Sequence, residues 1–325
     1  MKIEKLKELD SFCVAPWTHV HVIPDGTNVP CCLWDYSVHI DNKQKFGNIT
    51  DHDTIHSLLN GDEYKKLRRQ FVNGERAAGC HRCYTKEQNS SDSEAQPSLR
   101  QWMNSHFLDD SIQLQQSIET TANDGTLNTD TPIRYIDIRF GNICNLKCRM
   151  CGHHLSSSWY EELIEENKLD SSVTVGKNKF IHVDCYDKIE PLLADVKEIY
   201  FAGGEPMLYP EHIKILDRLI EIDNTDCIIR YNTNLTTLKY KNRSLVDLLE
   251  KFKHVSIGAS IDGMNDTVEY IRTNLVWDDF VKNYDTVKEK LPNVNIFPSS
   301  TISILNIETF HEFEKFAIEN KWTSN

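Results

Sequence analysis

The chain has 325 residues, enough for one large domain and a smaller one, and its formal net charge is −13. This charge argues against binding of nucleic acid or of an anionic membrane surface through charge alone. No apolar run approaches the roughly 18 residues of a membrane-spanning helix, and the charged N-terminal stretch MKIEKLKELDSF lacks the apolar core of a secretory signal. We therefore expect a cytoplasmic protein.

Residues 10–107 are expected to form a small domain. The stretch from Val20 to Ile23 alternates like a strand, turn residues follow it, and a second strand over 28–34 would complete a hairpin. We expect helices over 54–59 and 63–72. The alternation also suggests that His19 and His21 lie on one exposed face of the first strand.

The same region is rich in cysteine. In a reducing compartment, closely spaced cysteines indicate a metal site more often than a disulfide. The expected ligands are Cys13, Cys31, Cys80 and Cys83. Cys32 competes with Cys31, because neighbours in a strand point to opposite faces and only one of them can face the metal. A zinc-stapled domain is an alternative.

Residues 108–131 are predicted to be a linker, since the stretch up to Thr131 is rich in Asn, Asp, Ser, Thr and Gln. Just before it, Trp102, Met103 and Phe107 are expected to pack as a short helix. Two cysteines elsewhere stand alone, Cys185 and Cys227, and are interpreted as packing residues.

Strands and helices alternate from Arg134 onward, which predicts parallel βαβ units with function at the carboxyl ends of the strands. The predicted strands are 134–140, 197–202, 227–232, 254–260 and 294–304. The predicted helices are 155–167, 211–221, 243–251, 276–290 and 307–319.

The first of these strands runs into Cys144, Cys148 and Cys151, spaced C-x3-C-x2-C. Three thiolates on one loop can hold three irons of a four-iron cluster and leave the fourth iron open for chemistry. A zinc site with His153 or His154 as fourth ligand is the alternative.

Three later strand ends carry further motifs: Gly203-Gly204-Glu205-Pro206, then Thr233-Asn234, then Ser260 and Asp262. Together with the cysteine motif, this series resembles the radical SAM superfamily. The resemblance implies an α/β fold, a partial (β/α) TIM-like barrel over 132–325, with a [4Fe-4S] cluster on Cys144, Cys148 and Cys151 as the catalytic centre. S-adenosylmethionine on the open iron would then give a 5′-deoxyadenosyl radical.

The resemblance also implies which residues bind S-adenosylmethionine. Gly203, Gly204 and Glu205 would meet its amino group. Thr233, Asn234 and Ser260 would bind ribose or carboxylate, although each can equally be a turn or cap residue. Arg272 would pair the carboxylate or else be a solvated residue at a helix end. Asp262 would touch substrate or shape a turn.

Residues 10–107 resemble the twitch/SPASM auxiliary-cluster domain, here placed before the barrel. The resemblance is carried by Cys13, Gly26 and Cys31 at x12 and x4 spacing and by the later Cys80-x2-Cys83. It favours Cys31 over Cys32, and the cysteine count favours the one-cluster twitch form with a second, auxiliary [4Fe-4S] cluster. Because the family barrel usually has six units and this chain ends after five, we expect C-terminal truncation.

These resemblances imply an oxidoreductase-like radical SAM enzyme that modifies a peptide or protein. A dehydrogenase-like enzyme acting on a small metabolite is the alternative, and a non-catalytic, metal-stapled binding protein is an alternative of another class. A flavodoxin- or ferredoxin-like electron donor is the expected partner, with no nucleic acid or membrane partner.

Overall fold

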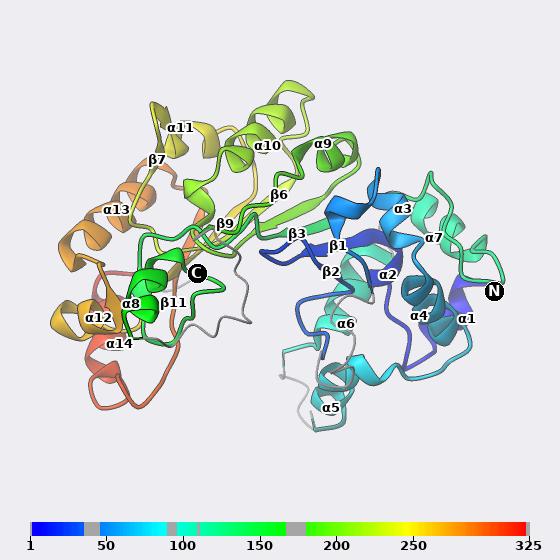
Figure 1. Cartoon of the computed structure of the whole chain (residues 1–325), viewed down its shortest axis with the longest axis horizontal. Coiled ribbons are helices and arrows are strands. Elements are labelled where there is room, and N and C mark those ends of the chain that lie inside the picture. Colours follow the sequence, from blue (N-terminus) through cyan, green and yellow to red (C-terminus); the bar gives the residue numbers. More distant parts are fainter. Residues whose placement is uncertain (1, 36–45, 90–95, 109–110, 167–179, 323–325) are drawn as a thin grey trace. The chain divides into compact units, whose positions relative to one another are not determined.

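The computed structural model describes residues 2–35, 46–89, 96–108, 111–166 and 180–322. Two compact units divide the chain (Figure 1). Unit 1 comprises Met1–Asp137 and Asp187–Val196, and unit 2 comprises Ile138–Tyr186 and Lys197–Asn325. The division falls within strand β3 (Tyr135–Ile138). Among the described residues, no helix has the length and apolar character that a membrane span requires.

Unit 1 contains a short hairpin surrounded by helices. Strands β1 (His19–Val22) and β2 (Asn28–Val29) pair antiparallel, with His21 opposite Val29. The helices are α1 (Ile3–Lys7), α2 (Ala15–Thr18), η2 (Ile49–Asp51), α3 (Ile55–Leu59), α4 (Asp62–Val72), η3 (Ala78–Cys80), α5 (His81–Asn89), α6 (Leu99–Met103), the π-helix η4 (Asn104–Leu108), α7 (Ile112–Glu119), α9 (Tyr186–Ile189) and η6 (Glu190–Leu192).

Two predicted helices of unit 1 are confirmed as α3 and α4. The Thr54 side chain caps α3 by accepting from Ser57 N, and the amphipathic face of α4 buries Tyr64, Leu67 and Phe71. The second strand of the hairpin, by contrast, is much shorter than predicted and ends at Val29.

The histidine prediction is wrong. All four residues of β1 are buried, and His19 and His21 are 1% and 3% exposed. His19 stacks on Tyr135 with ring centroids 4.4 Å apart, and His21 Nδ1 lies 2.8 Å from Asp137 Oδ2. Period-two alternation predicts a solvent face only when one side of the strand is open to water, and here the residues on both faces of β1 are buried.

The predicted linker is not a bare connector. Ser111 caps α7, and the stretch that follows is fixed to the rest of unit 1. Trp17 Nε1 donates to Thr121 Oγ1 at 2.8 Å, and Leu127 N donates to Asn60 Oδ1 at 2.7 Å. Polar composition had suggested a linker, but these polar side chains and backbone groups bond to one another.

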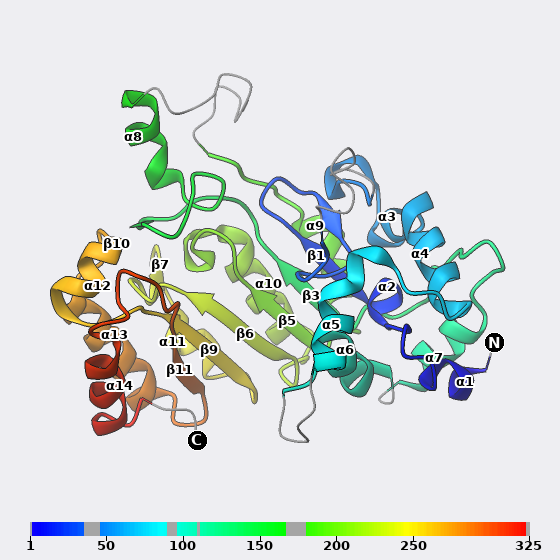
Figure 2. The same cartoon turned by 90° about the horizontal axis from the view of Figure 1, so that it is seen from below.

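Unit 2 is built on four parallel strands in the order β11-β9-β6-β5. They are β5 (Glu198–Phe201), β6 (Ile228–Thr233), β9 (Val255–Ser260) and β11 (Asn295–Ser299). Figure 2 shows these strands side by side, with α10 (Pro210–Glu221) and α11 (Leu245–Leu249) behind them. The other elements of unit 2 are β4 (Lys147–Cys148), η5 (Ser157–Trp159), α8 (Tyr160–Glu165), η7 (Pro206–Leu208), β7 (Lys239–Tyr240), β8 (Arg243–Ser244), α12 (Asn265–Ile271), β10 (Arg272–Thr273), α13 (Trp277–Lys290) and α14 (Phe310–Glu319).

The two faces of this parallel sheet differ in chemistry. One face carries apolar side chains in register across three strands, with Ile199 beside Ile229 and Ile229 beside Val255, all buried. The opposite face alternates with it and is largely polar: Tyr200 lies beside Arg230, and Asn232 beside Gly258. Helices cover the apolar face, because its burial stabilises the fold, and the polar face is left to line a pocket.

The predicted alternation of strands and helices is confirmed, and with it the α/β fold class. The predicted strand over 294–304 stops at Ser299, and the helix predicted from 155 begins as η5 at Ser157, before α8; its predicted last residue, 167, lies outside the described residues. Helix α12 was not predicted. Cys185 and Cys227 are 2% and 1% exposed, as expected of packing residues.

Candidate active site

The three cysteines of the C-x3-C-x2-C motif come together at one pocket of unit 2. Cys144, Cys148 and Cys151 line a cavity of about 320 Å³ at the carboxyl ends of β5, β6 and β9. The expected residues Gly203, Gly204, Thr233, Asn234, Ser260 and Arg272 line the same cavity. Of the residues expected to bind S-adenosylmethionine, Glu205 lies outside this lining, and so does Asp262, which was expected to touch substrate or shape a turn.

Gly204 makes a close approach to the cysteine loop. Gly204 N donates to Gly141 O at 3.2 Å, and Glu205 N donates to Ile143 O at 2.7 Å, next to Cys144. A Cβ at position 204 would lie 2.2 Å from Ile143 O, closer than any real contact. This glycine therefore lets the turn after β5 pack on backbone of the cysteine loop, whereas we had expected close approach to a ligand.

The Glu205 carboxylate is a buried acceptor that joins two strand ends. It accepts from Thr233 Oγ1 at 2.7 Å, Asn234 N at 2.7 Å and Met207 N at 3.2 Å. Burial raises the pKa of Glu205 to about 7, and the three hydrogen bonds oppose that rise. The side chain thus holds the wall of the pocket.

The side chains of Thr233 and Asn234 are also engaged within the protein. Thr233 Oγ1 donates to Glu205 and accepts from Leu235 N at 3.0 Å. Asn234 Nδ2 donates to Asn145 Oδ1 at 2.9 Å and lies 3.7 Å from Cys144 Sγ. Asn234 therefore holds the cysteine loop and Thr233 holds Glu205, and little of their hydrogen-bonding capacity is left for a ligand.

Ser260 and Arg272 are better placed to meet a ligand. Within the described part of the chain, the Ser260 hydroxyl makes no hydrogen bond, and it is half-buried in the pocket wall. Arg272 is 9% exposed, so the solvated alternative is wrong. Its Nε forms an ion pair with Asp262 Oδ2 at 2.6 Å, and Asp262 is fully buried.

Further residues line the pocket and were not predicted, among them the polar side chains of Arg139, Tyr200 and Asn232. The sequence carried a signal for Asn232. In β6 the polar residues Arg230 and Asn232 alternate with the buried Ile229 and Tyr231, which marks a polar face.

The donor set fits an iron–sulfur cluster. Burial raises the pKa of Cys144 to about 12 and of Cys148 to about 11, and the nearby Glu205 and Arg272 respectively add to and oppose these shifts. Such thiols ionise when a cation binds, because its charge favours thiolate. Among the described residues, no three His, Cys, Asp or Glu side chains are placed to share one ion. In an iron–sulfur cluster each cysteine binds a different iron, so its cysteines lie farther apart than ligands that share one ion.

The alternative of a zinc site with a histidine as fourth ligand would require that histidine to lie beside the three cysteines. Neither His153 nor His154 is among the described residues that line the pocket. Their rings pack edge to face, with centroids 5.9 Å apart.

The second set of cysteines lies together in unit 1. Burial is the main cause that raises the pKa of Cys31, and the neighbouring Cys80 and Cys13 raise it further. The pKa of Cys80 is raised in the same way, first by burial and then by the neighbouring Cys13 and Cys83. Cys13, Cys31, Cys80 and Cys83 thus each have at least one of the others close enough to feel its charge.

Turn geometry decides how Cys31 and Cys32 differ. They follow β2 in a turn, so the alternation expected of a strand does not apply. Cys31 is half-buried beside Cys80, whereas Cys32 is exposed. Trp34 packs so closely on Gly79 that a Cβ there would lie 2.4 Å from the indole, and this contact brings the turn to Cys80.

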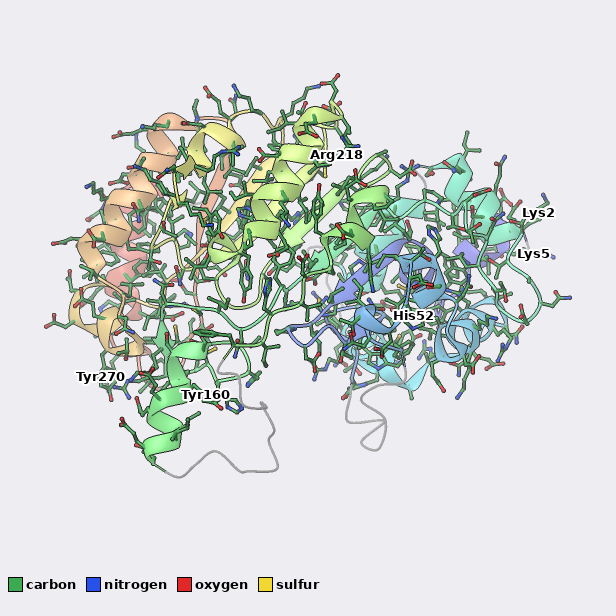
Figure 3. All side chains as sticks on the ribbon, turned by 45° about the horizontal axis from the view of Figure 1, so that its top comes forward. Lys2, Lys5, His52, Tyr160, Arg218 and Tyr270 are labelled. Atoms are coloured by element: carbon green, nitrogen blue, oxygen red, sulfur yellow. The ribbon has the colours of Figure 1, made fainter. Side chains whose placement is uncertain are left out.

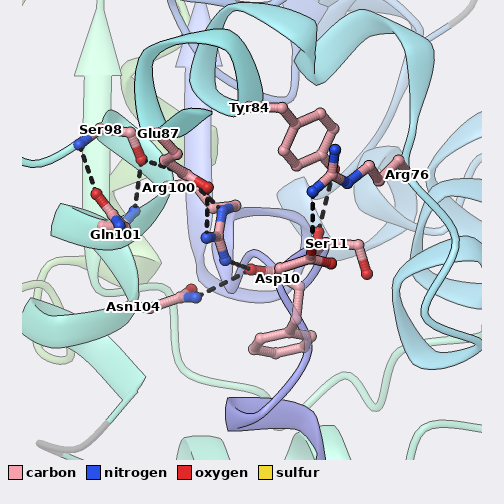
Figure 4. Close-up of polar contacts among 10 residues, drawn as sticks. Asp10, Ser11, Arg76, Tyr84, Glu87, Ser98, Arg100, Gln101 and Asn104 are labelled. Atoms are coloured by element: carbon pink, nitrogen blue, oxygen red, sulfur yellow. Dashed lines mark hydrogen bonds and ion pairs between the residues drawn. The ribbon is translucent and has the colours of Figure 1, made fainter. Parts of the chain in front are cut away.

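A polar network holds Cys13 in place (Figure 4). The Arg100 guanidinium pairs with both oxygens of Glu87, at 2.9 and 2.7 Å, and donates to Phe12 O at 2.9 Å. Asn104 donates to the same Phe12 carbonyl and accepts from Val14 N, each at 2.9 Å. Both neighbours of Cys13 are therefore fixed.

Comparison with known proteins gives the family. The model of the radical SAM superfamily matches residues 138–318, and that of the SPASM iron–sulfur cluster-binding domain matches residues 13–84. No curated protein matches the chain. The solved structure of native anSMEcpe with bound AdoMet and Cp18Cys peptide is 16% identical, with a TM-score of 0.42, over 59% of this chain and 49% of that chain.

The crystal structure of Streptococcus suis SuiB bound to S-adenosylmethionine is 17% identical, with a TM-score of 0.39, over 80% of this chain and 54% of that chain. The chain thus spans about half the length of these solved structures. Its radical SAM match covers more than half of its own 325 residues. The chain therefore belongs to the radical SAM superfamily, with a SPASM iron–sulfur cluster-binding domain ahead of the radical SAM domain.

Proposed function

We propose that the chain reductively cleaves S-adenosylmethionine and uses the resulting 5′-deoxyadenosyl radical to abstract hydrogen from a peptide or protein substrate. The family implies a [4Fe-4S] cluster and S-adenosylmethionine as cofactors, and the SPASM domain implies an auxiliary iron–sulfur cluster. The observation that carries the proposal is the single pocket shared by Cys144, Cys148 and Cys151 with Ser260 and Arg272.

We assign the three thiols to three irons of the cluster, which leaves one iron without a protein ligand. Ser260 and Arg272 then bind polar groups of S-adenosylmethionine from the ends of β9 and α12. Glu205 and Asn234 keep the cysteine loop against the strand ends. These residues position and orient, and the cofactors carry the chemistry.

We assign the auxiliary cluster to Cys13, Cys31, Cys80 and Cys83. The presence of this domain supports a peptide or protein substrate, through the resemblance to the twitch/SPASM group. A small electron-transfer protein of the flavodoxin or ferredoxin type is proposed as donor.

The first experiment is anaerobic reconstitution with iron and sulfide, followed by iron counting and an assay for 5′-deoxyadenosine with dithionite and S-adenosylmethionine. Wild-type protein is compared with Cys148→Ala. We expect about eight irons per wild-type chain, from two four-iron clusters, and deoxyadenosine from the wild type alone. Bound zinc, or no deoxyadenosine from fully loaded protein, would contradict the proposal.

The substrate class needs a separate test. We expect a peptide-containing fraction of the host lysate to accelerate deoxyadenosine formation by the loaded wild-type protein. Exhaustive protease digestion of that fraction should abolish the effect. If the digested fraction still accelerates the reaction, and its active component passes a small-molecule filter, the substrate is a metabolite and the peptide assignment is wrong.

A further inference from the structure

Arg272 is held directly opposite one of the cluster cysteines. The short strands β10 and β4 pair antiparallel, with Arg272 opposite Cys148 and Thr273 opposite Lys147. Arg149 extends the contact: its N donates to Ile271 O and its Nε to Tyr270 O, both at 2.8 Å. The cysteine loop therefore runs in fixed register along the end of α12.

The Arg272 guanidinium reaches the sulfur itself. Arg272 Nη1 lies 3.9 Å from Cys148 Sγ, within hydrogen-bonding distance for sulfur. Both groups are buried, each 9% exposed, so water screens their interaction weakly.

Asp262 fixes the other side of the guanidinium. Its Oδ2 lies 2.6 Å from Arg272 Nε, and its Oδ1 accepts from Thr301 N at 2.8 Å. The carboxylate and the sulfur thus contact different nitrogens of one guanidinium, Nε and Nη1. Among the causes that shift the pKa of Cys148, attraction to Arg272 is the largest after burial, and repulsion by Asp262 is smaller.

We infer that Arg272 is a positioning residue that raises the reduction potential of the cluster bound through Cys148, and that Asp262 limits the rise. The inference rests on the proposed function. Hydrogen bonds and positive charge at cluster sulfurs favour the reduced state, which carries one more negative charge. Removal of the arginine should lower the potential, and removal of the carboxylate should raise it.

This role is distinct from binding S-adenosylmethionine. Arg272 also lines the pocket, so one guanidinium can serve both purposes. A residue that acts only on the ligand would leave the potential unchanged when S-adenosylmethionine is absent. The measurement is therefore made without it.

The test is an EPR-monitored redox titration of wild type, Arg272→Gln and Asp262→Asn, with iron content measured on each sample. For Arg272→Gln we expect reduction to become about tenfold less favourable, which is 59 mV downward for one electron. For Asp262→Asn we expect a shift of opposite sign. The auxiliary cluster in the same sample is the internal standard, and its potential should not move.

Arg149→Gln is the matched control, since it removes the same charge one residue from Cys148. It loses the Nε bond to Tyr270 O but keeps the backbone bond from Arg149 N to Ile271 O. Arg149 is exposed, and its guanidinium lies 3.8 Å from the centre of the Tyr270 ring, a side chain that points outward in Figure 3. We expect no shift from it. If Arg272→Gln fails to hold iron, the direction of the Asp262→Asn shift decides the inference.

Two kinds of failure are separable. Wild-type protein without a cluster on Cys144, Cys148 and Cys151, or without deoxyadenosine, defeats the proposed function. Wild-type protein that passes both tests, with variants whose potentials are unchanged or shift in the same direction, overturns only the role of Arg272.

Discussion

The Thr233 hydroxyl donates a 2.7 Å hydrogen bond to Glu205 Oε1, which ties the end of β6 to the turn after β5. Asn234 N donates to the other carboxylate oxygen, and Asn234 Nδ2 reaches Asn145 of the cysteine loop. One buried carboxylate thus connects two strand ends to the loop between Cys144 and Cys148. The motif residue that we had expected at the ligand acts one layer behind it.

Glu205→Gln tests this connection. The amide keeps one acceptor oxygen but turns an NH₂ toward Asn234 N or Thr233, so one buried donor loses its partner. We expect a loss of about 1–3 kcal/mol in the free energy of unfolding and a lower iron content after reconstitution. Denaturant titration and iron counting measure both. Glu312→Gln, the same change on the exposed side of α14, should alter neither.

Gly204→Ala should damage the site through backbone contact alone. The added Cβ would lie 2.2 Å from Ile143 O, so the turn after β5 must move away from the cysteine loop. We expect reduced cluster loading and S-adenosylmethionine binding too weak to detect by calorimetry. Gly61→Ala is the control: its Cβ would lie 3.3 Å from Leu58 O, at the start of α4. Equal loading in both variants would refute the packing role of Gly204.

Cys31→Ser and Cys32→Ser form a matched pair. Cys31 lies beside Cys80 and Cys13, whereas the adjacent Cys32 is exposed. We expect Cys31→Ser to lose or degrade the auxiliary cluster, about four of the irons, and Cys32→Ser to keep it. Iron counting and EPR of the reduced proteins distinguish the two. Loss of iron in Cys32→Ser alone would reverse the assignment.

The buried carboxyl of Glu198 should make the free energy of unfolding depend on pH. This buried carboxyl is paired with Arg230 at 2.8 Å, yet burial dominates and raises its pKa from 4.5 to about 7. Between these values the folded state binds the extra proton, so the free energy of unfolding falls as pH rises from about 4.5 to 7.

Glu198→Gln abolishes this pH dependence, because the amide does not titrate. The free energy of unfolding of the variant relative to wild type should therefore rise as the pH increases from about 4.5 to 7. With about 1.4 kcal/mol per pKa unit, the expected change is about 3 kcal/mol between pH 4.5 and pH 8. Denaturant midpoints of both proteins at these two pH values provide the measurement. A difference between variant and wild type that is the same at both pH values would show that Arg230 compensates the burial.

Short-range sequence patterns predicted the structural features that depend on neighbouring residues alone. The apolar runs that became β5, β6 and β9 were placed to within one residue at each end, because apolar stretches bounded by turn residues have few alternatives. The cysteine motif was found from its spacing, and the residues at three strand ends were assigned through their resemblance to a family. The burial of His19 and His21 was not, because it depends on what covers the strand.

Contacts distant in sequence were beyond prediction. Cys148 and Arg272 are 124 residues apart, and two-residue strands such as β4 and β10 have no periodicity to detect. Arg272 was recognised as a site residue only through its resemblance to a family position. Its burial, its ion pair with Asp262 and its contact with sulfur all required the fold.

The sequence separation between Cys148 and Arg272 also means that the two cysteine sets are completed at different times during synthesis. Cys13, Cys31, Cys80 and Cys83, with Arg100 and Asn104, are complete when about a third of the chain has left the ribosome. The loop at Cys148 acquires its partner strand only once Arg272 has emerged. The four cysteines that we propose for the auxiliary cluster can therefore meet before the loop at Cys148 has its partner strand.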